Sequence, residues 1–390
     1  MFTFTSLPPL SLYVHLPWCV RKCPYCDFNS HASRNPVPEA AYIDALIADL
    51  EQDLPLVWGR SIESIFIGGG TPSLFAPQHI DRLLSEIRAR LPMHPGLEIT
   101  LEANPGTVEQ TKFQEFKAVG INRLSIGIQS FDPGLLEKLG RIHGTEEALT
   151  AAAMATKAGF DNFNLDLMFG LPGQSIDLAI ADIEQAITLA PTHISHYQLT
   201  IEPNTLFHRQ PPELPDEDII WEMQLQCQRL LSDHGYVHYE VSAYAREEYQ
   251  CIHNLNYWTF GDYLGIGAGA HSKITDARQQ DIARAWKIKH PAVYLEKAAT
   301  PQRIGGINKL TQSEAGLEFM MNALRLTNGF PAALFFQHAG LPITVIEESL
   351  QQAEQKGFIE RDIKIIRPTE HGQRFLNELL TLFVKNEHAA

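Results

Sequence analysis

Three cysteines crowd together near the start of the chain, where Cys19, Cys23 and Cys26 lie within the sequence CVRKCPYC. The other two of the five cysteines, Cys227 and Cys251, lie far downstream, so a set of paired disulfides fits poorly. Thiolates this close together are usually held by a cation that neutralises their charge. Three thiolates suit a [4Fe-4S] cluster, because one iron stays open to an exchangeable ligand. The alternatives are zinc, which normally takes four ligands, and three buried structural cysteines.

A second group of unusual residues follows the strands that the sequence predicts. It comprises GGGT at 68–71, EANP at 102–105, and Asp166. Parallel α/β folds build their binding sites at the carboxyl ends of their strands, so we expect these residues to gather at one mouth of the fold. Taken singly, each has a simpler explanation: the glycine run is also typical of a turn, and a carboxylate at a strand end is typical of a helix cap.

The elements that must position these residues follow a repeated βα pattern. Strands are predicted at 12–17, 64–69, 97–103, 122–129, 162–169 and 194–201. Amphipathic helices are predicted between them, at 40–54, 77–91, 146–158 and 175–189. Repeated βα units give parallel strands, and the spacing alone fits either an open doubly wound sheet or an incomplete barrel.

The pattern changes after about residue 205. A helix at 217–234 and a strand at 237–243 are expected to extend the sheet. Further on, helices are predicted at 314–326 and 343–356, a short alternating segment at 357–367, and a last helix at 370–384. These segments favour a small C-terminal helical domain of winged-helix-like character.

Composition and charge narrow the class of protein. Apolar residues make up 44% of the chain, enough for a buried core. The 31 basic and 46 acidic side chains give a net charge of -15, which argues against general nucleic-acid binding. The first ten residues lack a basic leader, and no run approaches the roughly 18 apolar residues of a membrane span. We therefore expect a cytoplasmic protein without a transmembrane segment.

The cysteine segment resembles the CxxxCxxC signature of the radical S-adenosylmethionine (SAM) superfamily. The glycines and threonine at 68–71 resemble the stretch that meets the amino group of SAM in that superfamily. Four further segments match its coproporphyrinogen-oxidase-like branch in order and spacing: LEANP at 101–105, GIQSF at 127–131, LGR at 139–141 and DLMFGLPGQ at 166–174.

This resemblance implies that Cys19, Cys23 and Cys26 hold a [4Fe-4S] cluster whose open iron chelates SAM. It also implies a SAM site lined by Tyr13, Tyr25, Gly69, Gly70, Thr71, Glu102, Gln129, Arg141 and Asp166. Carboxylates can accept hydrogen bonds from the ribose hydroxyls, and a guanidinium can hold the SAM carboxylate through its planar fork of donors.

Two features separate the chain from the oxygen-independent coproporphyrinogen III dehydrogenases of this branch. Those enzymes have a further cysteine where this chain has Phe28, and a longer arm than the 18 residues that precede Cys19. The segment CDFNSH at 26–31 instead resembles the HemW family of haem chaperones, and HNLNYW at 253–258 resembles the HNxxYW motif of that family. Because a neutral imidazole can ligate haem iron, His253 is the first candidate for an axial ligand. Without the resemblance, a histidine in such a segment is more typical of structural hydrogen bonding.

The resemblance implies a three-part architecture. Residues 1–235 would form a partial (β/α)6 radical SAM barrel with the cluster, residues 236–305 a sheet extension and linker carrying HNxxYW, and residues 306–390 a small C-terminal helical, winged-helix-like domain.

The leading hypothesis is a chaperone that binds haem together with a SAM-ligated cluster and passes the haem to client haemoproteins, membrane respiratory proteins among them. The alternative is an oxygen-independent coproporphyrinogen III dehydrogenase or another radical SAM enzyme that modifies tetrapyrroles. A transcription or RNA-associated factor is a third class, which the charge of -15 disfavours. The sequence leaves open whether SAM is cleaved and whether the chain forms a homodimer.

Overall fold

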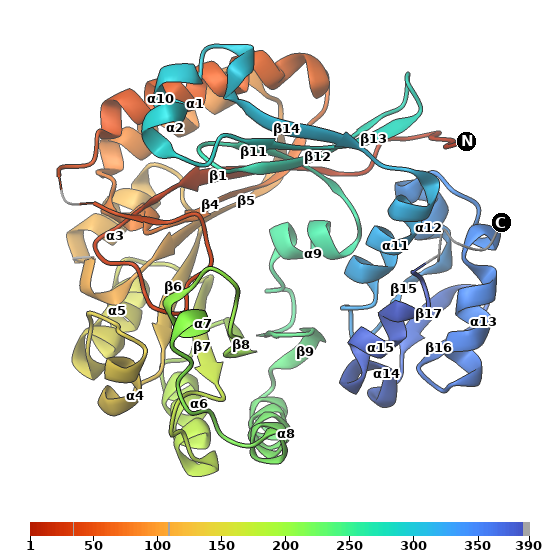
Figure 1. Cartoon of the computed structure of the whole chain (residues 1–390). Coiled ribbons are helices and arrows are strands. Elements are labelled where there is room, and N and C mark those ends of the chain that lie inside the picture. The colour runs from red at the N-terminus through yellow and green to blue at the C-terminus, as the bar shows by residue number, and fades with distance from the viewer. Residues whose placement is uncertain (34, 108–109, 385–390) are drawn as a thin grey trace.

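One long, curved sheet organises most of the chain (Figure 1). The computed structural model of the protein describes residues 1–33, 35–107 and 110–384. Among those residues the sheet has 12 strands, in the order β14-β13-β12-β11-β1-β4-β5-β6-β7-β8-β10-β9. The neighbours from β11 through β1 to β8 run parallel, and both edges continue with antiparallel strands.

The six parallel strands expected from the sequence are all present. They are β1 (Leu10–Leu16), β4 (Ile62–Gly69), β5 (Met93–Ala103), β6 (Arg123–Gln129), β7 (Phe163–Phe169) and β8 (His193–Gln198). Helices on the outer side of the arc (Figure 1) are α1 (Glu39–Asp53), α2 (Pro77–Arg90), α3 (Gln110–Ala118), α4 (Pro133–Lys138), α5 (Thr145–Lys157), α6 (Ile176–Thr188) and α8 (Glu217–Asp233). Side chains such as Val14, Ile67 and Leu165 are fully buried in one large core, as expected where helices cover a parallel sheet. The arrangement is the expected partial (β/α)6 barrel.

Antiparallel strands extend the sheet at both edges. Beyond β8 lie β10 (Ala243–Ala245) and β9 (Val237–Glu240), at the place where the sequence predicts an extension. Beyond β1 lie the parallel strand β11 (Asp262–Ile266) and then the antiparallel strands β12 (His271–Asp276), β13 (Asp281–Lys287) and β14 (Ile304–Lys309). The sequence predicts a sheet extension at 236–305 but none of these four strands individually. Strands such as β14, IGGINK, have side chains that are mostly exposed and lack a clear apolar alternation, so their pattern is weak.

The glycine-rich segment at 265–271 forms a turn between β11 and β12 and not a nucleotide loop, because a strand follows it. A Cβ on Gly267 would lie 2.4 Å from the carbonyl oxygen of His15, so this close approach requires glycine. Ile266 pairs in register with Val14 and is buried with it in the main core.

A buried network of charges ties α1 to this edge of the sheet. Asp49 and Asp53 of α1 each form ion pairs with Lys287 of β13 and with Arg303. The side chains of Asp49 and Lys287 are at most 1% exposed. Asp49 also accepts hydrogen bonds from the Tyr294 hydroxyl at 2.7 Å and from the backbone N–H of residue 267 at 3.2 Å. The network therefore fixes the turn between β11 and β12 relative to α1.

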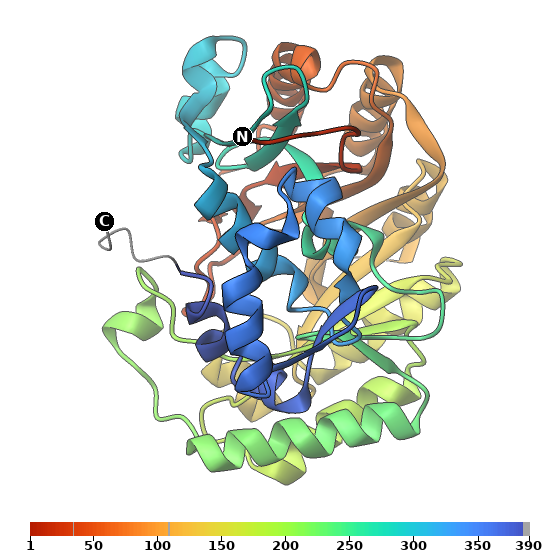
Figure 2. The same ribbon diagram turned by 90° about the vertical axis from the view of Figure 1, so that its right-hand side faces the viewer.

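The C-terminal domain has its own core and lies on the opposite side of the molecule from α3 to α5 (Figure 1, blue); in Figure 2 it faces the viewer. Its elements are α11 (Gln312–Ala323), β15 (Phe330–Pro331), α12 (Ala332–Ala339), α13 (Glu347–Gln355), β16 (Ile359–Arg361), β17 (Ile365–Pro368), α14 (Glu370–Arg374) and α15 (Leu376–Thr381). Three helices followed by a β-hairpin match the expected winged-helix-like order. The predicted last helix breaks at Phe375, whose backbone leaves the helical region with φ -110° and ψ 40°.

The first residues of the chain pack into this last domain. Phe2 and Phe4 belong to its core, and Thr3 N–H donates to the Gly340 carbonyl at 2.8 Å. A Cβ on Gly340 would lie 2.6 Å from the Phe4 ring, so glycine is needed where α12 ends with a left-handed residue. Across the described ranges no helix is long and apolar enough to span a bilayer.

Candidate functional site

The three cysteines lie on a loop whose two ends are tied together. Cys19 ends the short strand β2 (Trp18–Cys19), which pairs with β3 (His31–Ala32). The backbone carbonyl of Cys19 accepts a hydrogen bond from Ser33 N–H at 2.9 Å. Cys23 and Cys26 lie between these anchors and are partly exposed, as is Cys19. The loop starts just past the end of β1, at the mouth expected from the sequence.

Asn29 clamps this loop to the sheet extension. Its side-chain amide donates to the backbone carbonyls of Ala268 and Lys289, both at 2.8 Å. Its own carbonyl lies 3.0 Å from Nε2 of His15, whose Nδ1 lies 3.0 Å from the hydroxyl of Tyr13. Burial lowers the pKa of His15 to about 4, so the ring is neutral and can bridge these two groups. Neither Asn29 nor His15 was among the predicted site residues.

The surroundings of the thiols fit an iron–sulfur cluster. Burial raises the pKa of Cys19, against hydrogen bonds from Thr71 and Ser30 that lower it, and the charges of Cys26 and Cys23 raise it as well. A cation would offset this repulsion between the three thiolates. Arg141 Nη1 already donates to Cys23 Sγ at 3.7 Å. A pocket of about 300 Å³ opens beside Cys23 and Cys26, and its wall includes the cations Arg21, Lys22 and Arg209. A cluster with three thiolate ligands carries net negative charge, which these cations offset.

Single-ion binding receives no such support. In the described part of the chain, no group of three or more Cys, His, Asp or Glu side chains is placed to hold one metal ion. A four-iron cluster has no need of that convergence, because each thiolate binds a different iron. The donor set therefore fits the cluster better than it fits zinc.

The glycines at the end of β4 are required by close contacts. A Cβ on Gly70 would lie 2.4 Å from the carbonyl oxygen of Trp18, and one on Gly69 would lie 2.5 Å from the His15 ring. Gly69 also has a φ of 115°. Thr71 N–H donates to the Trp18 carbonyl at 2.7 Å. The segment thus runs directly against the strand that leads into the cysteine loop.

Two carboxyl groups face the same mouth. Glu102, at the end of β5, accepts a hydrogen bond from Gly69 N–H at 3.0 Å. Burial, together with the charge of Asp166, raises the pKa of Glu102 to about 8, so near neutral pH this carboxyl can both donate and accept. Burial also raises the pKa of Asp166, whereas hydrogen bonds from Asn164 at 2.8 Å and Ser125 at 3.1 Å act in the opposite direction.

Arg141 connects the cluster loop with the ends of β5 and β6. Its Nη2 donates to Asn104 Oδ1 at 2.7 Å and to the Gly127 carbonyl at 2.6 Å, while its buried Nε has no partner. Asn104 in turn donates to Thr71 Oγ1 at 2.8 Å. A second pocket is lined by Cys23, Thr71, Asn104 and Arg141 among others. Asn104 lies inside the LEANP segment but was not among the predicted site residues.

Gln129 and Tyr25 complete the predicted SAM set. Gln129 has a positive φ of 72°, rare for a residue with a side chain, and its Oε1 accepts from the Tyr197 hydroxyl at 2.8 Å. Tyr25 packs against Phe207, with ring centroids 6.4 Å apart, and burial raises its pKa while the nearby Arg141 lowers it. Of the predicted set, Gly69, Gly70, Thr71, Glu102 and Gln129 lie at the carboxyl ends of parallel strands. Tyr13 and Asp166 lie within β1 and β7, and Tyr25 and Arg141 come from the cysteine loop and from the segment after α4.

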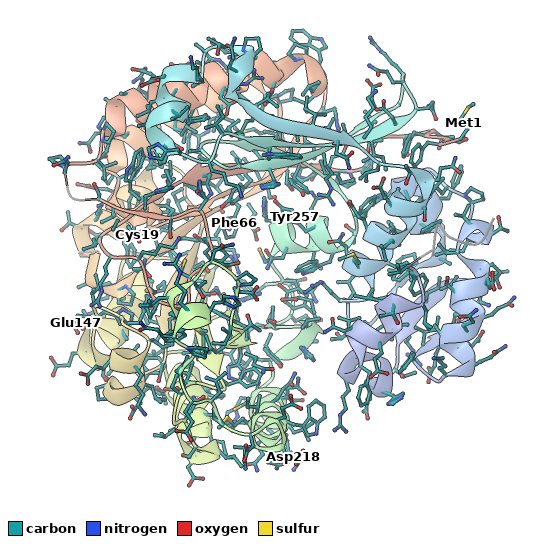
Figure 3. The ribbon with its side chains drawn as sticks, in the orientation of Figure 1. Met1, Cys19, Phe66, Glu147, Asp218 and Tyr257 are labelled. Atoms are coloured by element: carbon teal, nitrogen blue, oxygen red, sulfur yellow. The ribbon has the colours of Figure 1, made fainter. Side chains whose placement is uncertain are left out.

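The HNLNYW segment forms the short helix α9 (Ile252–Trp258), which packs against the inner side of the sheet near β4. His253 is only 2% exposed, and its Nδ1 lies 2.9 Å from Ser64 Oγ. Its ring contacts Phe66 of β4 and Tyr257 of α9, with centroid distances of 5.0 and 5.1 Å; both residues are labelled in Figure 3. Tyr13, from the predicted SAM set, lies 6.4 Å from the same ring.

Comparison with known proteins decides the family. The radical SAM superfamily model matches residues 13–186, and the HemN C-terminal domain model matches residues 310–375. The chain is 49% identical to the heme chaperone HemW of Escherichia coli (strain K12), over 97% of this chain and 99% of the relative. It is 33% identical to the heme chaperone HemW of Bacillus subtilis (strain 168), over 96% and 99% of the two chains. The chain belongs to the HemW family.

A solved structure of the coproporphyrinogen III oxidase HemN from Escherichia coli, described as a radical SAM enzyme, matches this HemW-family fold with a TM-score of 0.82. It covers 97% of this chain and 90% of the other, at 23% identity. At that identity the likeness shows the fold alone. Two sequence features pointed to HemW, and they lie in different places. Phe28 lies on the cysteine loop and is 63% exposed. The segment at 253–258 forms most of α9, against the inner side of the sheet.

Proposed function

We propose that this protein is a haem chaperone that carries a SAM-ligated [4Fe-4S] cluster and passes haem to client haemoproteins. The observation that carries this proposal is the full-length identity of 49% to a protein named heme chaperone HemW. The geometry supports it, because the cysteine loop and the HNLNYW helix adjoin the same sheet, with Tyr13 between His15 and His253.

Cys19, Cys23 and Cys26 would hold the cluster, and SAM would occupy the open iron. The bound cluster and SAM would supply one-electron chemistry to this site. Around SAM, Glu102 would pair with the ribose hydroxyls through a carboxyl whose pKa of about 8 allows it to donate or accept. Arg141 would hold the SAM carboxylate, using the unpartnered Nε of its buried guanidinium.

His253 would be the haem ligand. Burial and the charge of Arg123 lower its pKa to about 3, so the imidazole is in the neutral form that binds iron. Its Nδ1 lies within hydrogen-bonding distance of Ser64 Oγ. Its buried Nε2 has no hydrogen-bond partner and would be the atom that ligates the iron. Tyr257 and Trp258 of the same helix would contribute aromatic surface to the macrocycle.

Anaerobic reconstitution followed by haem titration tests this function. Four irons and four sulfides per chain are expected, together with a Soret shift that His253→Ala weakens and that the exposed control His94→Ala leaves unchanged. An unchanged spectrum in the wild type, or equal shifts in wild type and His253→Ala, would contradict the proposal. Incubation with coproporphyrinogen III, SAM and a reductant tests the alternative. Formation of protoporphyrinogen would favour a dehydrogenase.

A further inference from the structure

The helix α9 is unusual in which of its residues it buries. Of its seven residues, the two that are fully buried, His253 and Asn256, are polar. Its aliphatic Ile252 is 41% exposed. A helix held in place by hydrophobic burial shows the opposite arrangement, with apolar residues inside and polar residues outside. The residues that α9 buries most deeply are therefore polar, whereas its Leu255 and Trp258 are only partly buried, against the core of the C-terminal domain.

Buried polar atoms without a hydrogen-bond partner concentrate on the same helix. In the part of the chain that the structure describes there are nine such side-chain atoms, and three of them lie on α9: His253 Nε2, Asn256 Oδ1 and Trp258 Nε1. Each such atom has given up its bond to water without replacement, which disfavours the docked position. Water would satisfy all three atoms if the helix withdrew.

Glu98 of β5 holds the start of α9. Its Oε1 accepts from His253 N–H at 3.1 Å and from Cys251 Sγ at 3.5 Å, and its Oε2 accepts from Ile252 N–H at 3.2 Å. Glu98 is itself 4% exposed and lies 3.9 Å from Arg123 Nε, an atom that also lacks a hydrogen-bond partner. One buried carboxylate thus supplies three of the polar contacts that keep the helix docked.

We infer that α9 docks reversibly, with Glu98 as the positioning residue that latches it, and that His253 becomes available to haem only when this latch opens. This inference rests on the proposed function. In the docked position the imidazole is 2% exposed and is covered by Phe66 and Tyr257, so a porphyrin iron cannot reach it. Withdrawal of α9 would expose the imidazole and the aromatic residues of the motif together.

The chain contains its own reporter for this opening. Cys251 directly precedes α9 and is 0% exposed, and Cys227 on α8 is equally buried but has no contact with Glu98. Thiol labelling read by peptide mass spectrometry follows both sites in one sample of reconstituted protein. The rate is taken at saturating reagent, where helix opening limits the reaction and thiol reactivity does not.

We expect Glu98→Ala to raise the plateau labelling rate of Cys251 by about 10- to 100-fold, because charge-assisted hydrogen bonds are lost. Glu98→Gln keeps a carbonyl acceptor and should fall between Glu98→Ala and the wild type. The control Glu63→Ala, on the neighbouring strand β4, should match the wild type, and Cys227 should stay slow throughout. Equal Cys251 rates in all variants would overturn the latch, and so would a parallel rise at Cys227 in both Glu98 variants.

Haem titration supplies the second readout. Because only the open state binds, Glu98→Ala should bind haem with a lower apparent Kd than the wild type, in proportion to the gain in open state. Weaker haem binding by this variant would overturn the inference, since Glu98 would then assist binding in the docked position. The labelling is done without haem, so a wild type that binds no haem would refute the proposed function while the latch is still tested.

Discussion

Replacing Asp49 by Asn should destabilise the protein far more than the same change five positions earlier on the same helix. Asp49 is 0% exposed and receives Lys287 Nζ at 2.6 Å and Arg303 Nε at 2.8 Å. The neutral amide would leave these two buried cations with Asp53 as their only carboxylate within this network. Asp44, by contrast, pairs with Arg82 at the surface, where the two side chains are 61% and 45% exposed.

The two changes differ in expected size by severalfold. Removing one partner of a buried ion pair costs about 3 to 5 kcal/mol, because a buried charge is left uncompensated. An exposed pair contributes about 0 to 1 kcal/mol. A chain of 390 residues has an unfolding entropy near 0.8 kcal/mol/K, so the expected drop in Tm is about 4 to 6 °C for Asp49→Asn and about 1 °C or less for Asp44→Asn.

Differential scanning calorimetry of both variants and the wild type, reconstituted and kept anaerobic, measures this difference. Reversibility is checked by a second scan of each sample. If Asp49→Asn melts within about 1 °C of Asp44→Asn, the network does not stabilise the fold as its geometry indicates.

Three further outcomes follow from the site and its surroundings. Arg141→Met should weaken SAM binding at least about tenfold in anaerobic equilibrium dialysis, since it removes hydrogen bonds to a neighbouring amide, a backbone carbonyl and Cys23; unchanged binding would contradict this role. Asn29→Ala should speed the loss of the cluster to an iron chelator, measured by the decay of the cluster absorbance, because the loop loses its hydrogen bonds to the carbonyls of Ala268 and Lys289. A rate equal to that of the wild type would refute the role of Asn29 as a clamp. Burial lowers the pKa of His196 to about 3, so the unfolded chain binds more protons between pH 6.5 and 3 and stability should fall as pH falls through that window. The Tm of His196→Gln should fall less steeply with decreasing pH than the Tm of the wild type. Parallel pH profiles of Tm for the two proteins would argue against this contribution of His196.

The repeated βα pattern of the sequence predicted the parallel strands closely. The expected strand at 162–169 became Phe163–Phe169, and the expected helix at 77–91 became Pro77–Arg90. These elements carry long apolar runs covered by helices on one side, so their periodicity is strong. The cysteine loop, the glycine stretch and the strand-end carboxylates could also be predicted from the sequence, because each is specified by a few neighbouring residues.

Features that depend on distant contacts were not readable. Asn29 looks like an ordinary loop residue until the turn at Ala268 is placed against it, more than two hundred residues later in the chain. Glu98 alternates with apolar neighbours like any solvent-facing strand residue, yet it is buried beneath α9. The polar segment HNLNYW did not indicate that its histidine would be buried between α9 and the sheet, because that burial depends on tertiary packing and not on the local pattern.

The placement of Phe2 and Phe4 has a consequence for synthesis and folding. These two rings complete a core that otherwise consists of residues from 260 to 383, so they reach their native partners only after that later segment has been made. The central strand β1 waits similarly, because one of its two neighbours is β11. During synthesis the apolar side chains of Phe2 and Phe4 and one edge of β1 therefore stay without their native partners until the residues from 260 onward have followed.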